Sequence, residues 1–165
     1  VLDVLAAREG RIPELSAFLQ STSPLTTPDD IDGTIAALRR DDAQCALAVT
    51  PFYHFLWRPG ARGAEGINHA ATNRPRRQDM APQLLETGAV YVMRTAGFLE
   101  TRHRFFGSVA LYVQPGERCL EIDEPLDFVK AEAVVRALSG DDDGCACACR
   151  RAGEGPMAHP IEARA

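Results

Sequence analysis

Two acids in this sequence have the type and spacing of metal ligands. Glu121 and Asp123 are separated by Ile122 alone. On a strand, side chains two positions apart point to the same face, so both carboxylates would lie together while Ile122 enters the core. Mg²⁺ prefers one or two carboxylates together with phosphate oxygens and water, the set expected around a nucleoside triphosphate. The alternative is a solvent-facing acidic edge, because such pairs are common on half-exposed strands.

A basic cluster lies in residues 73–79, where Arg74, Arg76, Arg77 and Gln78 stand close together. The arginine side chains are planar, permanently charged donors that suit phosphate or carboxylate groups. Its position just before an apolar run favours an anion-binding role. The alternative is a solvated loop whose arginines pair with surface acids.

Aromatic residues gather in two places. Phe105 and Phe106 precede Gly107 and could offer their faces to a sugar, although paired phenylalanines more often belong to a core. The second place is the stretch from Phe52 to Trp57. It is either a core strand or a surface that packs against a partner.

Charge and composition exclude several functions. The 165-residue chain has 18 basic and 23 acidic residues, and this net charge of −5 argues against binding to nucleic acid or to an anionic membrane. Residues 43–57, the longest stretch without a charged side chain, are fewer than the roughly 20 that a membrane-spanning helix needs. The first residues have no basic and apolar regions of a signal peptide. Five cysteines form neither an even framework nor a Cys-x-x-Cys pair, which favours the reducing cytoplasm.

The elements that must position these groups alternate along the chain. Helix signals begin at Thr27-Pro28 and at Pro125, and the second helix closes at Gly140. Strands separated by helices predict an α/β domain with a mostly parallel sheet. We expect this domain to cover residues 1–140, and residues 141–165 to form a disordered tail. The strand predictions are 15–19, 45–49, 88–93, 109–113 and 119–123.

Five blocks, read in order, resemble the acylneuraminate cytidylyltransferases, the CMP-sialic acid synthetases. The resemblance covers roughly residues 15–138, and its strength lies in the order of the blocks rather than in any single motif. The blocks are residues 19–25 with Asp30-Ile31-Asp32 downstream, then 77–79, 88–92, 105–107 and 121–128.

The resemblance implies a fold and a reaction. The fold is a Rossmann-like, three-layer nucleotide-diphospho-sugar transferase fold, here truncated at its amino-terminal, glycine-rich CTP-binding segment. The reaction transfers CMP from CTP to the anomeric hydroxyl of a sialic acid or related nonulosonate and releases pyrophosphate. Mg²⁺ is the implied cofactor and a homodimer the implied assembly. The alternatives are a 3-deoxy-octulosonate cytidylyltransferase or a non-catalytic binding or dimerisation fragment.

The resemblance also implies roles for individual residues. Glu121 and Asp123 would hold the metal, although the family usually has Asp at the first position. Thr26 and Thr87 stand where the family usually has Arg and Asn, respectively, which puts sugar specificity in question. Catalytic roles fall on Asp123, Arg77 and Gln78, and substrate-binding roles on Gln20, Thr22, Ser23, Tyr91, Phe105 and Phe106.

Overall fold

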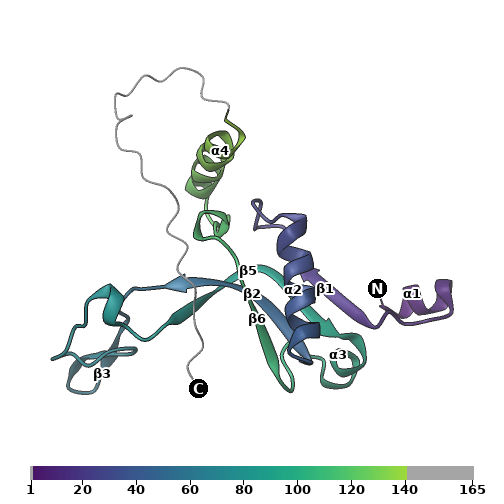
Figure 1. The fold of residues 1–165 in the computed structure, drawn as a ribbon, viewed down its shortest axis with the longest axis horizontal. Coiled ribbons are helices and arrows are strands. Elements are labelled where there is room, and N and C mark those ends of the chain that lie inside the picture. Colours follow the sequence, from purple (N-terminus) through teal and green to yellow (C-terminus); the bar gives the residue numbers. More distant parts are fainter. Residues whose placement is uncertain (1, 141–165) are drawn as a thin grey trace.

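The computed structural model describes residues 2–140. Its main sheet has four strands in the order β1-β5-β2-β6. β5 pairs antiparallel with both β1 and β2, whereas β6 pairs parallel with β2. β1, β2 and β6 therefore run in one direction, and β5 alone runs in the other (Figure 1). The strands are β1 Leu15–Leu19, β2 Cys45–Phe52, β5 Gln83–Arg94 and β6 Val109–Val113.

The α/β class is confirmed, but the prediction of a mostly parallel sheet is wrong. Only the β2–β6 pair is parallel among the strand pairs of this sheet. The chain travels from β2 to β5 without a crossover helix, so β5 returns antiparallel and inserts between β1 and β2. The intervening segment contains the hairpin of β3 (Trp57–Gly60) and β4 (Gly63–Gly66), and then the short 3-10 helix η1 (Arg77–Asp79).

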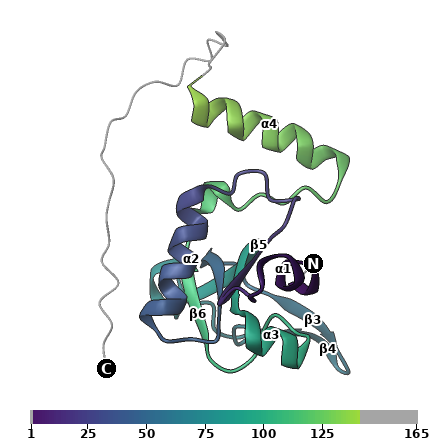
Figure 2. The ribbon, with the colours of Figure 1, turned by 90° about the vertical axis from the view of Figure 1, so that its right-hand side faces the viewer.

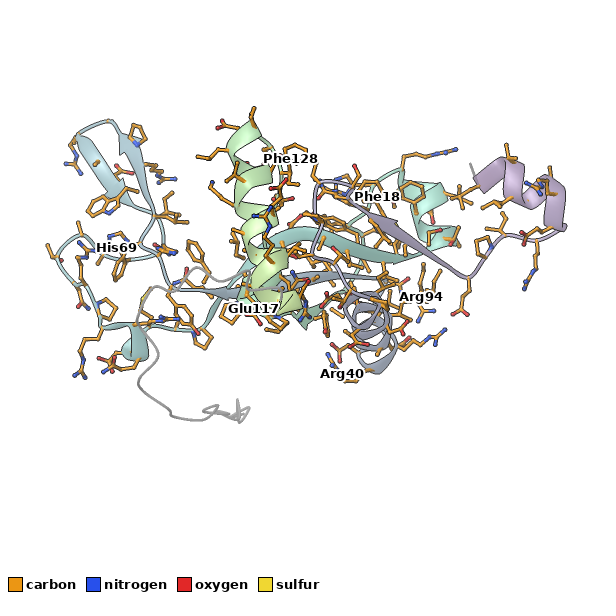
Figure 3. The ribbon with its side chains drawn as sticks, turned by 90° about the horizontal axis from the view of Figure 1, so that it is seen from above. Phe18, Arg40, His69, Arg94, Glu117 and Phe128 are labelled. Atoms are coloured by element: carbon orange, nitrogen blue, oxygen red, sulfur yellow. The ribbon has the colours of Figure 1, made fainter. Side chains whose placement is uncertain are left out.

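We call residues 53–82 the arm, because Figure 1 shows them extending away from the main sheet. The imidazole of His69 lies edge-on between Phe55 and Trp57, with both ring centroids at 4.7 Å (Figure 3). Tyr53 and Trp57 are nonetheless 39% and 45% exposed. The aromatic stretch is therefore not a core strand.

The helix α2 (Pro28–Arg40) begins and lies as its sequence predicts. Thr27 is the N-cap, and its backbone N–H donates to Asp30 Oδ2 at 2.9 Å. Pro28 fits the first turn, where a backbone donor is not needed. α2 covers one face of the sheet (Figure 2). The buried cluster on this side consists of small and branched side chains, including Ala37, Leu38, Ala46, Val90, Val92 and Ala110.

The opposite face of the sheet carries Tyr91, with Phe105 and Phe106 packed against it. Phe18 and Arg40, the latter on α2, lie on opposite sides of the sheet (Figure 3). A second buried cluster on the Phe18 side is partly covered by α3 (Thr95–Thr101) and by the loop that follows it. This cluster contains Cys45, Leu47, Val49, Tyr91 and Met93, with Phe98, Phe105 and Phe106 packed against it.

The strand predicted at 15–19 is confirmed, whereas the one predicted at 119–123 is wrong. Residues 15–19 do form β1, but β1 is an edge strand whose Phe18 and Leu19 are 50% and 47% exposed. Residues 119–123 form no strand, because the chain turns off the sheet at Pro115 and passes through the 3-10 helix η2 (Gly116–Arg118). The two acids of this segment therefore do not share one face of a pleated strand.

The second predicted helix is confirmed as α4 (Pro125–Ser139), and Gly140 closes it with a φ of +71°. α4 stands away from the sheet (Figures 1 and 2). Most of its large apolar residues are consequently exposed, with Phe128 at 59% and Leu138 at 57%, while Ala131 is buried. A short helix that the sequence did not predict, α1 (Leu2–Glu9), precedes β1. The tail prediction for residues 141–165 lies outside the described residues.

Within residues 2–140, every helix is too short or too polar to cross a lipid bilayer.

Candidate functional site

Glu121 meets the end of β1 and a bulge of β5. The β2–β5 register pairs Leu47 with Tyr91 but Val49 with Glu86, so β5 carries extra residues at this point. Gly88 lies in the bulge with a φ of +70°. A Cβ on Gly88 would collide with Glu121 Oε1 and lie only 2.7 Å from the side-chain oxygen of Gln20. The two predicted residues Gln20 and Glu121 are thus brought together by a glycine that leaves room for both.

Negative charge is concentrated around Glu121. Burial raises the pKa of Glu121, and the charges of Asp123 and Glu86 raise it further. The two predicted acids are therefore close enough to interact even though they are not on a strand. Sequence reasoning missed Glu86. Its only signal was its place two residues before Gly88, and the bulged register that brings it to this site is not visible in the sequence.

Tyr91 connects the acids to the aromatic face of the sheet. Its hydroxyl donates a hydrogen bond to Glu86. Burial, that hydrogen bond and the charge of Glu86 raise the pKa of Tyr91 to about 12. The ring centroid lies 6.0 Å from that of Phe18 and 5.9 Å from that of Phe105. At neutral pH Tyr91 is therefore protonated, and its hydroxyl is a hydrogen-bond donor held in place beside the rings of Phe18 and Phe105.

Asp123 and Thr22 line a common cavity of about 450 Å³ between the loop after β1 and the start of α4. The backbone N–H of Ile122 donates to the carbonyl oxygen of Thr22 at 2.8 Å, which joins the two segments. Asp123 is exposed to this cavity. Ser23 is only 6% exposed, and its hydroxyl has no hydrogen-bond partner among the described residues.

A buried ion pair holds the acidic segment to α2. Asp30 is fully buried, and its Oδ1 accepts a 2.6 Å hydrogen bond from Nη2 of Arg118. Nε of Arg118 donates to Oδ2 at 3.2 Å. Burial alone would raise the pKa of Asp30, but the hydrogen bonds from Arg118 and Thr27 outweigh it and hold the pKa below its ordinary value. Since Arg118 is three residues before Glu121, this pair helps to fix where the acids lie.

Arg77 and Gln78 lie in η1, within the arm. The guanidinium carbon of Arg77 is 3.9 Å from the ring centroid of Tyr53. Arg77 lines a cavity of about 510 Å³ together with Cys119, two residues before Glu121. It is not among the residues that line the Asp123 cavity. Gln78 is exposed.

The two predicted phenylalanines have different surroundings. The backbone N–H of Phe106 donates to Cys45 Sγ at 3.1 Å, and its ring lies so close to Gly97 that a Cβ there would collide with it. Phe106 is thereby anchored to the core. Phe105 packs edge-on against Tyr91 and is half-buried.

Within the described part of the chain, no three His, Cys, Asp or Glu side chains are arranged as a ready-made metal site. The acids near residue 121 are therefore not a closed cage. Mg²⁺ needs only one or two protein carboxylates when phosphate oxygens and water complete its shell. The chemistry of Glu121 and Asp123 fits that open kind of site.

Comparisons with known proteins support the resemblance that the sequence blocks indicated. No protein-family model matches the chain. The chain is 29% identical over 129 residues to N-acylneuraminate cytidylyltransferase B of Danio rerio, covering 74% of this chain and 30% of that protein. It is 28% identical to N-acylneuraminate cytidylyltransferase of Oncorhynchus mykiss, covering 74% of this chain and 29% of that protein. A third match, N-acylneuraminate cytidylyltransferase A of Danio rerio, is 25% identical over 78% of this chain and 31% of that protein.

These matches confirm the resemblance to N-acylneuraminate cytidylyltransferases. The chain spans about three tenths of the length of the curated relatives it matches.

Proposed function

We propose that this chain is part of a cytidylyltransferase that transfers CMP from CTP to the anomeric hydroxyl of a sialic acid or a related nonulosonate. The observation that carries the proposal is the meeting of Glu121 with Gln20 at Gly88, beside the charges of Asp123 and Glu86. The names of the three relatives support the same chemistry.

In this reaction the anomeric hydroxyl oxygen attacks the α-phosphorus of CTP. The bond from that phosphorus to the bridging oxygen breaks, and pyrophosphate leaves with the electron pair. The hydroxyl proton is lost to solvent or to a nearby carboxylate. Such a reaction needs in-line placement of the two substrates and neutralisation of the charge on phosphate more than covalent help from the protein.

Glu121 and Asp123 are the residues that would hold Mg²⁺, which would neutralise charge on the phosphate oxygens. The two carboxylates differ in their exposure to solvent. Asp123 faces the cavity it shares with Thr22, whereas Glu121 is half-buried against the bulge of β5. A half-buried carboxylate beside two others favours a bound cation, because the cation offsets the burial and the repulsion that together raise the pKa of Glu121.

The chain's own residues account for positioning. Gln20 and Thr22 are on the loop that follows β1, and their backbones are tied to Ala89 and Ile122, respectively. These hydrogen bonds hold the loop against β5 at one point and against the segment that carries the two acids at another. For Arg77, the cavity it lines beside Cys119 supports a role in binding an anionic group of a substrate.

The arm supports a homodimer as the working assembly. It exposes Tyr53, Leu56 and Trp57 at 39%, 42% and 45%, respectively, and such side chains are typical of interfaces. Light scattering of the gene product tests this proposal. A dimer that Trp57→Glu converts to a monomer is the expected result, and a monomeric wild type would contradict it.

The activity is tested on the gene product that contains this chain. We expect Mg²⁺-dependent release of pyrophosphate from CTP in the presence of a sialic acid. Asp123→Asn should abolish this release, and Glu132→Gln, an exposed acid of α4, is the matched control. A panel that includes 3-deoxy-octulosonate separates the two acceptor classes. The proposal fails if no acidic keto sugar supports release of pyrophosphate.

A further inference from the structure

A third cavity, of about 440 Å³, lies on the sheet face opposite α2. Its floor is apolar and comes from Phe18 of β1, Met93 of β5 and Phe98 of α3. Its rim is the turn after α3, which presents Arg102, His103 and Arg104. A volume of this size is within the range of small-molecule sites, about 300–1,000 Å³.

The rim is charged and free to bind. Within residues 2–140, neither Arg102 nor Arg104 has a carboxylate within ion-pair distance, whereas Arg94 and Arg118 are paired with acids. Arg102 has a left-handed backbone with a φ of +57°, which is uncommon for a residue other than glycine. The imidazole of His103 is engaged with the backbone of Phe105 at 3.0 and 3.1 Å, so the two arginines are the available cations.

Arg104 connects this cavity to the acids. Its guanidinium carbon lies 4.3 Å from the ring centroid of Tyr91. The charges of Arg104 and Glu121 act on the same Tyr91 hydroxyl, in opposite directions. Tyr91 therefore contacts both Arg104, at the rim of this cavity, and Glu86, one of the carboxylates around Glu121.

This arrangement matches the chemistry of the acceptor in the proposed reaction. In a 2-keto acid sugar, the carboxylate and the reacting anomeric hydroxyl are attached to the same carbon. A group that binds the carboxylate consequently fixes the hydroxyl within a few ångströms of itself. Arg104 lies one tyrosine ring away from the acids, so it is placed both to bind the carboxylate and to hold the anomeric hydroxyl near the acids. Arg77 lines a different cavity.

We infer that Arg104 binds the carboxylate of the acidic acceptor, and that the uncharged part of the sugar lies in the cavity over Phe18 and Phe98. This inference rests on the proposed function for the identity of the acceptor. It assigns acceptor recognition to Arg104, which lies outside the five blocks of family resemblance. The block at 105–107 begins at its neighbour Phe105.

The test is direct binding to the chain by saturation-transfer NMR, without CTP or Mg²⁺, using N-acetylneuraminic acid and its methyl ester as probes. The wild type should bind the acid at least about 10-fold more tightly than the ester, because the ester has no negative charge to pair with the guanidinium. Arg104→Gln should reduce the affinity for the acid to that for the ester. Arg104→Lys should restore part of the difference.

Equal affinity of the wild type for acid and ester would overturn the inference, and this comparison needs no variant. An unchanged affinity for the acid in folded Arg104→Gln would overturn it too. The outcome is separate from that of the proposed function. Preferred binding of the acid without any transfer from CTP would support the cavity and reject the reaction.

Discussion

Replacing Arg118 by leucine should destabilise the fold more than its partial exposure indicates. Its side chain is 21% exposed, but the partner Asp30 is fully buried. Removing the arginine leaves a buried carboxylate whose remaining close hydrogen bonds come from the backbone N–H and hydroxyl of Thr27, at 2.9 and 2.8 Å. Tyr112 offers only a long contact of 3.5 Å.

The magnitude follows from these contacts. Breaking a buried pair typically costs about 3–5 kcal/mol. The bonds from Thr27 and the α2 N-terminus still stabilise Asp30, so we expect the lower end, about 3 kcal/mol. For a chain of this size that corresponds to a fall in Tm of roughly 10 °C. Asp30→Asn should cost less, because asparagine can still accept from Thr27 while Arg118 turns to solvent.

The pH dependence provides a second signature. In the wild type the pKa of Asp30 is below its ordinary value of 3.8, so its contribution to stability is present at neutral pH and is lost as the pH falls through that lowered pKa. In Arg118→Leu, burial without the guanidinium raises the pKa of Asp30. Protonation of Asp30 in acid then removes the unpaired buried charge that destabilises the variant. The stability difference between wild type and variant should therefore be largest near neutral pH and shrink in acid.

Urea unfolding of the wild type, Arg118→Leu, Asp30→Asn and the double variant measures the coupling. The double variant should be clearly more stable than the sum of the two single losses indicates. Additive losses, or a difference between wild type and Arg118→Leu that does not depend on pH, would show that Asp30 and Arg118 are not energetically coupled. Arg136→Leu, which removes an exposed pair on α4, is the matched control and should cost less than about 1 kcal/mol.

Three further predictions concern the acids and Tyr91. Gly88→Ala should lower stability by about 1–2 kcal/mol, because alanine is strained at a positive φ, and should reduce pyrophosphate release by displacing Glu121; normal activity would contradict this. Glu86→Gln should move the pKa of Tyr91 part of the way back from about 12 towards 10.0, since burial remains, which ultraviolet titration against Tyr91→Phe would detect. At limiting Mg²⁺, where the metal-free enzyme predominates, pyrophosphate release should fall in acid through a pKa above the 4.5 that is ordinary for a glutamate, because Glu121 must be ionised to take up the metal; a profile flat down to that value would count against this role.

The local elements were predictable because their signals are local. Thr27, Pro28 and the acids of the first turn define the start of α2, and Pro125 and Gly140 define both ends of α4. Apolar runs located β1, β2 and β6 and the centre of β5. These features depend on residues within one turn or one strand of each other.

The strand directions and the acid site depend on distant pairings, which a single sequence does not display. β5 is antiparallel because an arm instead of a helix leads into it, and its bulge places Glu86 and Gly88 beside Glu121. Residues 119–123 have the alternation of a strand, but Arg118 and Ile122 tie them to Asp30 and to the loop after β1. The signals that mark the start and end of α4 likewise do not show whether it packs on the sheet, and its Phe128 and Leu138 are exposed.

In the proposed reaction, Glu121 and Asp123 hold a divalent cation together with CTP. Electron paramagnetic resonance of Mn²⁺, a substitute for Mg²⁺, measures this directly on the gene product with and without CTP. We predict that CTP strengthens Mn²⁺ binding by the wild type, and that Asp123→Asn weakens it about 10-fold or more while Glu132→Gln does not. Equal Mn²⁺ affinity of the wild type and Asp123→Asn in the presence of CTP would contradict the claim.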